Sequence, residues 1–204
     1  MIQMKMICFG DSNTYGYDAC SAFGGRLPKE ERWVDVLAEM SGWNLVNEGL
    51  NGREIPRQWF LERLDQILEA DVPADRLFLM LGTNDILNGG YVDVSGIGKR
   101  MEMLLAHLLS QPYFRADQIV LASPPRLVMA HMGIAEASME RAIAKLRPEY
   151  RKLAEKYGVR FIDVGGWQIP LTPDGVHFTA GGHVMFAGKL WEELKLWESQ
   201  EKKF

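Results

Sequence analysis

Short apolar segments of strand length alternate along the chain with longer amphipathic segments, and this alternation limits the fold more than any other feature. The apolar segments lie at 4–9, 44–49, 76–82, 118–123 and 159–164. Helical patterns with polar and apolar faces lie at 30–41, 56–70, 95–110, 136–157 and 181–199. Strands that are apolar on both faces and alternate with helices are typical of a covered parallel sheet. The sequence therefore predicts an α/β fold, a three-layer α/β/α sandwich around a five-stranded parallel sheet.

The size and composition of the chain fit one soluble globular domain spanning residues 1–204. Of its 204 residues, 47% are hydrophobic and 25% are charged, which is ordinary for such a domain. No internal repeat, low-complexity tract or linker divides the sequence. The net charge is −4, and the basic residues are scattered among acidic ones, so we expect no nucleic-acid partner.

Two cysteines and an ordinary amino terminus bear on where the chain resides. Cys8 falls in the first apolar segment and is expected to be a buried thiol, and with only Cys20 beside it no disulfide framework is expected. The first residues lack the apolar region of a signal peptide, and no segment approaches the length of a membrane span. We expect a cytoplasmic protein without a membrane span. Its apolar and aromatic content also favours a homo-oligomer.

The residues that directly follow each apolar segment are the candidates for function, because ligands of open parallel sheets bind at the carboxyl ends of the strands. The polar segments found there are Asp11-Ser12-Asn13, residues 48–52, 82–85 and 124–126, and a final loop that reaches "PDGVHFT". The irregular segments 18–27 and 124–133 are expected to form loops over the same edge.

Ser12 is a candidate nucleophile, but a serine hydroxyl needs an adjacent base, usually a histidine oriented by a carboxylate. His177 follows Asp174 by three residues, a spacing that can place both side chains on one side of a turn. Asp174 would orient the imidazole, which would exchange the Ser12 proton with the leaving group. The other histidines fit structural roles. His107 is expected to pack on a helix, His131 to lie in a loop, and His183 to face solvent or cap the last helix.

Attack by a serine on an ester creates a negatively charged oxygen, which preorganised N–H donors stabilise. Three donors follow the first three apolar segments. Gly52 can bring its backbone N–H close because it has no Cβ, Asn84 offers a side-chain amide, and Ser12 adds its own backbone N–H. We expect these three residues to form an oxyanion hole.

Two other classes of function compete for this fold. A nucleotide- or flavin-binding module would need a G-x-G-x-x-G run or a P-loop, and the sequence has neither. A metal-dependent phosphoesterase would need closely spaced ligands, and only Asp174 and His177 are so placed. The serine segment also lacks the G-x-S-x-G elbow of α/β-hydrolases. The prediction therefore includes no cofactor and no metal.

Four sequence blocks, in order, give the whole chain a resemblance to the SGNH, or GDSL-type, hydrolases: "FGDSNTYG", "NEGLNG", "LGTND" and "DGVHF". The resemblance implies a flavodoxin-like sheet, the triad of Ser12, His177 and Asp174, and the oxyanion hole of Ser12, Gly52 and Asn84. Two features depart from the simplest match. Asn13 stands where many members have leucine, and the glycine matched in the second block is Gly52 rather than Gly49.

The segments "NEGLNGR", "LGTND" and "SPPRL" resemble the arylesterase-like branch, whose members cleave short acyl esters and can pass the acyl group to acceptors other than water. The predicted function is a serine esterase or acylhydrolase that cleaves short-chain carboxylic esters of small molecules through an acyl-enzyme. A carbohydrate O-acetyl esterase and a lysophospholipase-like lipase are the alternatives. The residues expected to bind substrate are Asp11, Asn13, Tyr15, Trp59, Ile86 and Trp167. Arg53, Arg57 and Arg126 flank the blocks and could meet an anionic substrate or simply be solvated.

Overall fold

The computed structural model describes residues 3–89 and 93–201, and it contains a five-stranded parallel sheet. The strand order is β2-β1-β3-β4-β5, and all four neighbouring pairs are parallel. The strands are β1 (Lys5–Gly10), β2 (Asn44–Gly49), β3 (Arg76–Met80), β4 (Ile119–Ala122) and β5 (Arg160–Ile162). The predicted α/β fold and its parallel sheet are confirmed.

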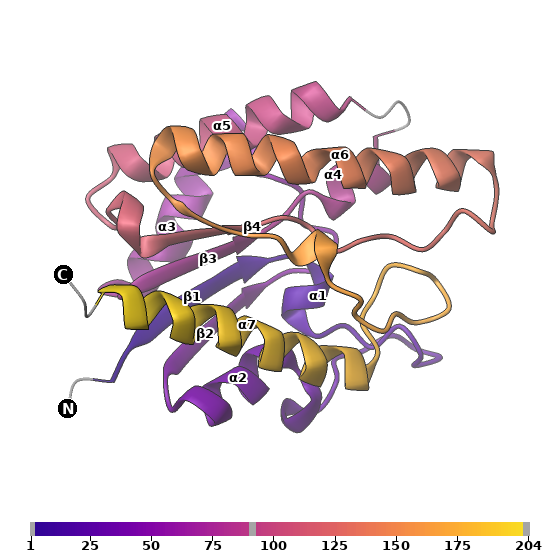
Figure 1. Ribbon diagram of the computed structural model, residues 1–204, viewed down its shortest axis with the longest axis horizontal. Helices are drawn as coiled ribbons and strands as arrows, with labels where there is room; N and C mark the ends of the chain where they lie inside the picture. The colour runs from indigo at the N-terminus through magenta and orange to yellow at the C-terminus, as the bar shows by residue number, and fades with distance from the viewer. Residues whose placement is uncertain (1–2, 90–92, 202–204) are drawn as a thin grey trace.

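Helices cover both faces of the sheet (Figure 1), as the alternating sequence pattern predicts. The helices are α1 (Ser12–Tyr15), α2 (Trp33–Ser41), α3 (Leu61–Asp71), α4 (Thr83–Leu87), α5 (Val94–Ser110), α6 (Ile134–Tyr157) and α7 (Ala180–Glu201). Short 3-10 turns lie at Lys29–Glu31, Gln58–Phe60, Ala116–Gln118 and Val164–Gly166. In Figure 1, α2 and α7 lie on one face, and α3, α5 and α6 lie on the other. No helix within the described ranges is both long and apolar enough to cross a membrane.

Successive residues of the central strands point into two separate cores, because side chains of a strand alternate between its faces. On β1, Ile7 and Phe9 pack toward α3, α5 and α6, whereas Met6 and Cys8 pack toward α2 and α7. Cys8 is a buried free thiol, as expected. Burial of the central strands on both faces fixes their register, and the register aligns the carboxyl ends at one edge.

The last helix buries a histidine that we expected to face solvent or cap the helix. His183 is fully buried, whereas its neighbour Val184 is 47% exposed. The Nδ1 atom of His183 accepts a hydrogen bond of 3.4 Å from the Trp33 backbone N–H, and its ring meets the edge of Phe178. Burial, and secondarily the charge of His177, lowers the pKa of His183 to about 4. His183, in the first turn of α7, is therefore a neutral core residue that packs against α2.

Two short helices, α1 and α4, were not predicted, since they span only four and five residues and are too short to show a periodic pattern. Each begins two or three residues after the end of a central strand. α1 follows β1, and α4 follows β3 after Leu81 and Gly82. These turns present Ser12 and Asn84 at the same edge of the sheet, because β1 and β3 are neighbours.

Candidate active site

Ser12 lies at the first position of α1, directly beyond the buried end of β1. Asp11 caps the helix, and its side chain accepts a hydrogen bond of 3.0 Å from the Asn13 backbone N–H. The turn is tight. A Cβ atom on Gly10 would lie 2.1 Å from the Thr14 hydroxyl oxygen, so only glycine fits there. The Ser12 residue is 7% exposed, which leaves it a narrow approach from solvent.

His177 reaches Ser12 from the loop that precedes α7. The Ser12 Oγ and His177 Nε2 atoms lie 3.0 Å apart, although the two residues are 165 positions apart in the sequence. On its other side, His177 Nδ1 lies 2.7 Å from Asp174 Oδ2. The sharp turn between them needs Gly175, whose φ is +70° and whose Cβ would clash with the Val128 carbonyl oxygen. The structure thus brings the three residues of the predicted triad into one chain of contacts.

Asp174 is held as a carboxylate by several donors. Burial would raise its pKa, but hydrogen bonds from the His177 ring and backbone N–H, the Thr172 hydroxyl and the Val176 N–H together lower the pKa to about 2. Three of these donors, from Thr172, Val176 and His177, converge on Oδ1 at 2.7–3.0 Å. Asp174 is therefore ionised at neutral pH and can orient the imidazole through Nδ1.

The predicted oxyanion donors lie at the ends of three neighbouring strands. The Asn84 side-chain Nδ2 donates one hydrogen bond of 3.1 Å to the Arg53 carbonyl oxygen, which leaves its second N–H free for another acceptor. Gly52 has a φ of +73° and no atom within 4 Å of its Cβ position. In the described ranges, the backbone N–H groups of Ser12 and Gly52 donate to no protein atom. Gly49 differs, because its backbone packs directly on Tyr15.

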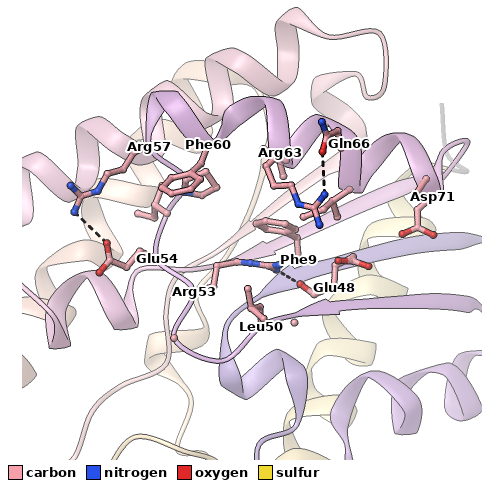
Figure 2. A pocket seen from close by; sticks show the side chains of 17 residues that line it. Phe9, Glu48, Leu50, Arg53, Glu54, Arg57, Phe60, Arg63, Gln66 and Asp71 are labelled. Atoms are coloured by element: carbon pink, nitrogen blue, oxygen red, sulfur yellow. Dashed lines mark hydrogen bonds and ion pairs between the residues drawn. The ribbon is translucent and has the colours of Figure 1, made fainter.

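Arg53 fastens the Gly52 loop to the sheet, a role that the sequence did not reveal. Its guanidinium donates to the carbonyl oxygens of Gly10, at 3.1 Å, and Glu48, and it lies over the Phe9 ring with a centroid distance of 4.0 Å. Figure 2 shows this side chain extended along Phe9 toward Glu48. Burial lowers the pKa of Arg53 to about 10, against the opposing charges of Glu48 and Asp11. It remains a cation at neutral pH.

A groove of about 900 Å³ adjoins this loop and runs between β2 and α3 (Figure 2). Gly52 and Arg53 line the groove near the triad, and Asp71 lines it at the end of α3. Its charged side chains form local pairs, such as Arg57 with Glu54. The groove therefore borders the Gly52 side of the site, and neither Ser12 nor His177 lines it.

Several residues that we expected to contact substrate occupy other positions. Ile86 is fully buried in the core, so this assignment is not retained. Trp167 is partly buried with one side against the Phe186 ring, and it remains a predicted substrate contact. Asp11 and Asn13 are each only 1% exposed and serve the backbone instead.

Two of the expected contacts stay open to solvent, in whole or in part. Trp59 is 71% exposed beside Phe60, next to the groove. Tyr15 is half-buried beneath the guanidinium of Arg26. These two residues remain predicted substrate contacts.

Two residues near the triad have surroundings that the sequence did not indicate. The Tyr17 ring lies 4.9 Å from the His177 ring and lines the same corner as the triad, and Tyr17 directly follows the "FGDSNTYG" block. Asp11, which we expected to bind substrate, is the second. Burial raises its pKa to about 6, although the Asn13 N–H and the positive charges of His177 and Arg53 act in the opposite direction.

Comparisons with known proteins agree with this arrangement. The model of the GDSL-like Lipase/Acylhydrolase family matches residues 8–185. A carbohydrate acetylesterase family member from Sinorhizobium meliloti is 29% identical, with a TM-score of 0.79, over 96% of this chain and 99% of that one. The native aryl esterase of M. smegmatis is 25% identical, with a TM-score of 0.78, over 95% of this chain and 99% of that one. A search of curated protein sequences gives no match.

Proposed function

The chain belongs to the GDSL-like lipase/acylhydrolase family and is a carboxylic ester hydrolase, and on this premise we propose that it cleaves short-chain esters through an acyl-enzyme on Ser12. The observation that carries the proposal is the continuous contact from Ser12 Oγ through the His177 ring to Asp174, with distances of 3.0 and 2.7 Å. These are hydrogen-bonding distances, and they join a hydroxyl, an imidazole and an ionised carboxylate in the order that nucleophilic catalysis requires.

In the acylation step, His177 Nε2 takes the hydroxyl proton as Ser12 Oγ bonds to the ester carbonyl carbon. The carbonyl oxygen becomes an oxyanion, which accepts hydrogen bonds from the Ser12 and Gly52 N–H groups and from the Asn84 amide. The bond to the leaving oxygen then breaks, and His177 delivers its proton to that oxygen. An alcohol leaves, and Ser12 carries the acyl group.

In deacylation, water attacks the acyl carbon while His177 Nε2 accepts its proton. The carboxylic acid departs, the proton returns to Ser12 Oγ, and the enzyme is restored. Asp174 stays ionised throughout, because its donors hold its pKa at about 2. An alcohol that enters the site in place of water would accept the acyl group by the same steps, which is acyl transfer.

Short acyl chains are the proposed substrates because little of the nucleophile is exposed. Ser12 is 7% exposed, and the tilted Tyr17 ring lies 4.9 Å from the ring of the histidine that acts on it. The S. meliloti carbohydrate acetylesterase family member, which is similar over nearly the whole chain, supports a small acyl group as well. Carbohydrate O-acetyl groups and lysophospholipid esters are the alternatives.

The proposal is tested with p-nitrophenyl esters of increasing acyl length, acetylated sugars and lysophospholipids, assayed with wild type and Ser12→Ala. We expect the highest kcat/KM for the acetate ester and no turnover above background with Ser12→Ala. Ser110→Ala removes a serine hydroxyl at the far end of α5 and should hydrolyse esters at the wild-type rate. Ester hydrolysis by Ser12→Ala would show that Ser12 is not the nucleophile, and a preference for long acyl chains would favour the lipase alternative.

A further inference from the structure

Asn13, the residue after the nucleophile, has its side chain buried between α1 and the His177 loop. It is 1% exposed, which gives a substrate no surface to touch. A buried amide is costly unless its donors and acceptors are paired, so its partners show what it does.

Both ends of the Asn13 amide bond to the backbone on either side of His177. The Nδ2 atom donates to the Val176 carbonyl oxygen at 3.1 Å, and the Oδ1 atom accepts from the Phe178 N–H at 2.9 Å. The two partners are the residues immediately before and after His177, and the side chain thereby pairs with the loop as a neighbouring strand would.

The covalent chain carries this restraint directly to the nucleophile. Asn13 adjoins Ser12 in α1, and its backbone N–H is fixed by Asp11 at 3.0 Å. One peptide unit and one planar amide therefore connect Ser12 to the backbone around His177, and they restrict the distance between Ser12 Oγ and His177 Nε2. Among the described residues, three hydrogen bonds join α1 to residues 174–178. They are the two bonds of the Asn13 amide and the Ser12–His177 contact itself.

We infer that Asn13 is a positioning residue that sets the approach of His177 to Ser12. The inference rests on the proposed function of those two residues. An error of about 1 Å in the placement of a catalytic group can cost on the order of 100-fold in rate. Removal of the amide should therefore slow the chemical step far more than it weakens substrate binding.

The chain offers a matched control in Asn47, which makes the same pair of bonds elsewhere. Its Nδ2 donates to the Thr14 carbonyl oxygen at 2.9 Å, and its Oδ1 accepts from the Gly49 N–H at 3.0 Å. Asn47 thus ties α1 to β2 and makes no contact with the His177 loop. A residue that merely supports α1 would behave like Asn47, whereas a residue that positions His177 would not.

The experiment compares Asn13→Leu with Asn47→Leu, each of which keeps the side-chain volume and removes both hydrogen bonds. For p-nitrophenyl acetate we expect Asn13→Leu to lower kcat roughly 10- to 100-fold with KM changed less than about 3-fold. Asn47→Leu should keep kcat within about 3-fold of wild type. Circular dichroism and urea unfolding confirm that both variants are folded, and Asn13→Ser, which keeps a hydroxyl at this position, replaces Asn13→Leu if the latter does not fold.

A second readout separates positioning from support. Phenylmethanesulfonyl fluoride sulfonylates a serine whose proton an adjacent base removes, with fluoride as the leaving group. Its rate of inactivation should fall in Asn13→Leu by about the same factor as kcat, and stay unchanged in Asn47→Leu. A folded Asn13→Leu with wild-type kcat, or equal losses in both variants, would overturn the inference. Ester hydrolysis that persists in Ser12→Ala would instead refute the proposed function.

Discussion

The two loops that meet Ser12 are held by side chains of opposite kind. The His177 loop is tied to α1 by the neutral, fully buried amide of Asn13. The Gly52 loop is tied to β1 and β2 by the charged guanidinium of Arg53, which borders an open groove. In the proposed mechanism His177 moves a proton over a short distance, so its rate depends on the placement of its loop, whereas the Gly52 loop supplies an N–H donor to the developing charge. The comparison suggests separate tests of the two sides, one for proton transfer and one for oxyanion stabilisation.

The largest effect should come from the proton-transfer side, through Asp174→Asn. The substitution keeps the shape of the side chain but removes the negative charge that orients His177 through Nδ1. In triads of this kind such a change lowers kcat by roughly 10³- to 10⁴-fold. We expect a loss of this size in kcat for p-nitrophenyl acetate with KM nearly unchanged. If Asp174→Asn lost less activity than a variant of the oxyanion donors, oxyanion stabilisation would contribute more to the rate than the orientation of His177.

Among single substitutions of the proposed oxyanion hole and its support, Asn84→Ala should lower kcat the most. One preorganised donor stabilises the transition state by about 3 kcal/mol, so kcat should fall roughly 10²-fold. Asn88→Ala, at the exposed end of α4, is the matched control, since within residues 3–89 and 93–201 its amide bonds only to Glu54. Steady-state kinetics of both variants decide the matter, and an unchanged kcat in Asn84→Ala would remove this residue from the oxyanion hole.

Arg53→Met should have a smaller effect, because the donors themselves stay in place and only their tether is lost. Methionine keeps an apolar stem over Phe9 but cannot donate to the Gly10 and Glu48 carbonyl oxygens. We expect kcat/KM to fall roughly 10-fold, with Arg53→Lys between this variant and wild type. The double variant with Asn84→Ala should lose less than the product of the two, since both act on one oxyanion. Full additivity would show that Arg53 acts elsewhere.

The pattern of strands and the four sequence blocks were sufficient to predict the sheet and the triad contacts, because both depend on local signals. Asn13 could not be assigned from sequence, since its partners lie 163 and 165 positions away and its amide could equally have faced a substrate. Ile86 was misassigned because an aliphatic residue near a motif packs in the core as readily as in a pocket. The burial of His183 was not predicted, since it depends on packing against Trp33, which lies 150 positions away.

The last contrast concerns stability rather than rate, because Asp11 and Asp174 should respond oppositely to pH. Burial raises the pKa of Asp11 to about 6, so the protonated form is favoured in the folded state. That contribution to stability is fully present below about pH 4 and is lost as the pH rises through 6, by on the order of 3 kcal/mol. Asp174, with a pKa of about 2, stabilises the fold above about pH 4 and loses that contribution as the pH falls through 2.

Urea unfolding between about pH 4 and pH 7 tests the prediction for Asp11. Asp11→Asn keeps an acceptor for the Asn13 N–H but cannot ionise, so its free energy of unfolding should vary less with pH than that of wild type. Equal pH dependence in the two proteins would mean that Asp11 ionises normally in the folded state.

The covalent state of Ser12 during turnover is the most direct test of the proposed chemistry. Wild-type protein mixed with excess p-nitrophenyl acetate is quenched in acid, digested and analysed by mass spectrometry. We predict one acetyl group on the peptide that contains Ser12, greatly reduced in His177→Ala and missing in Ser12→Ala. Rapid hydrolysis by wild type with the acetyl group on another side chain, or with equal labelling of Ser12→Ala, would contradict an acyl-enzyme on this serine.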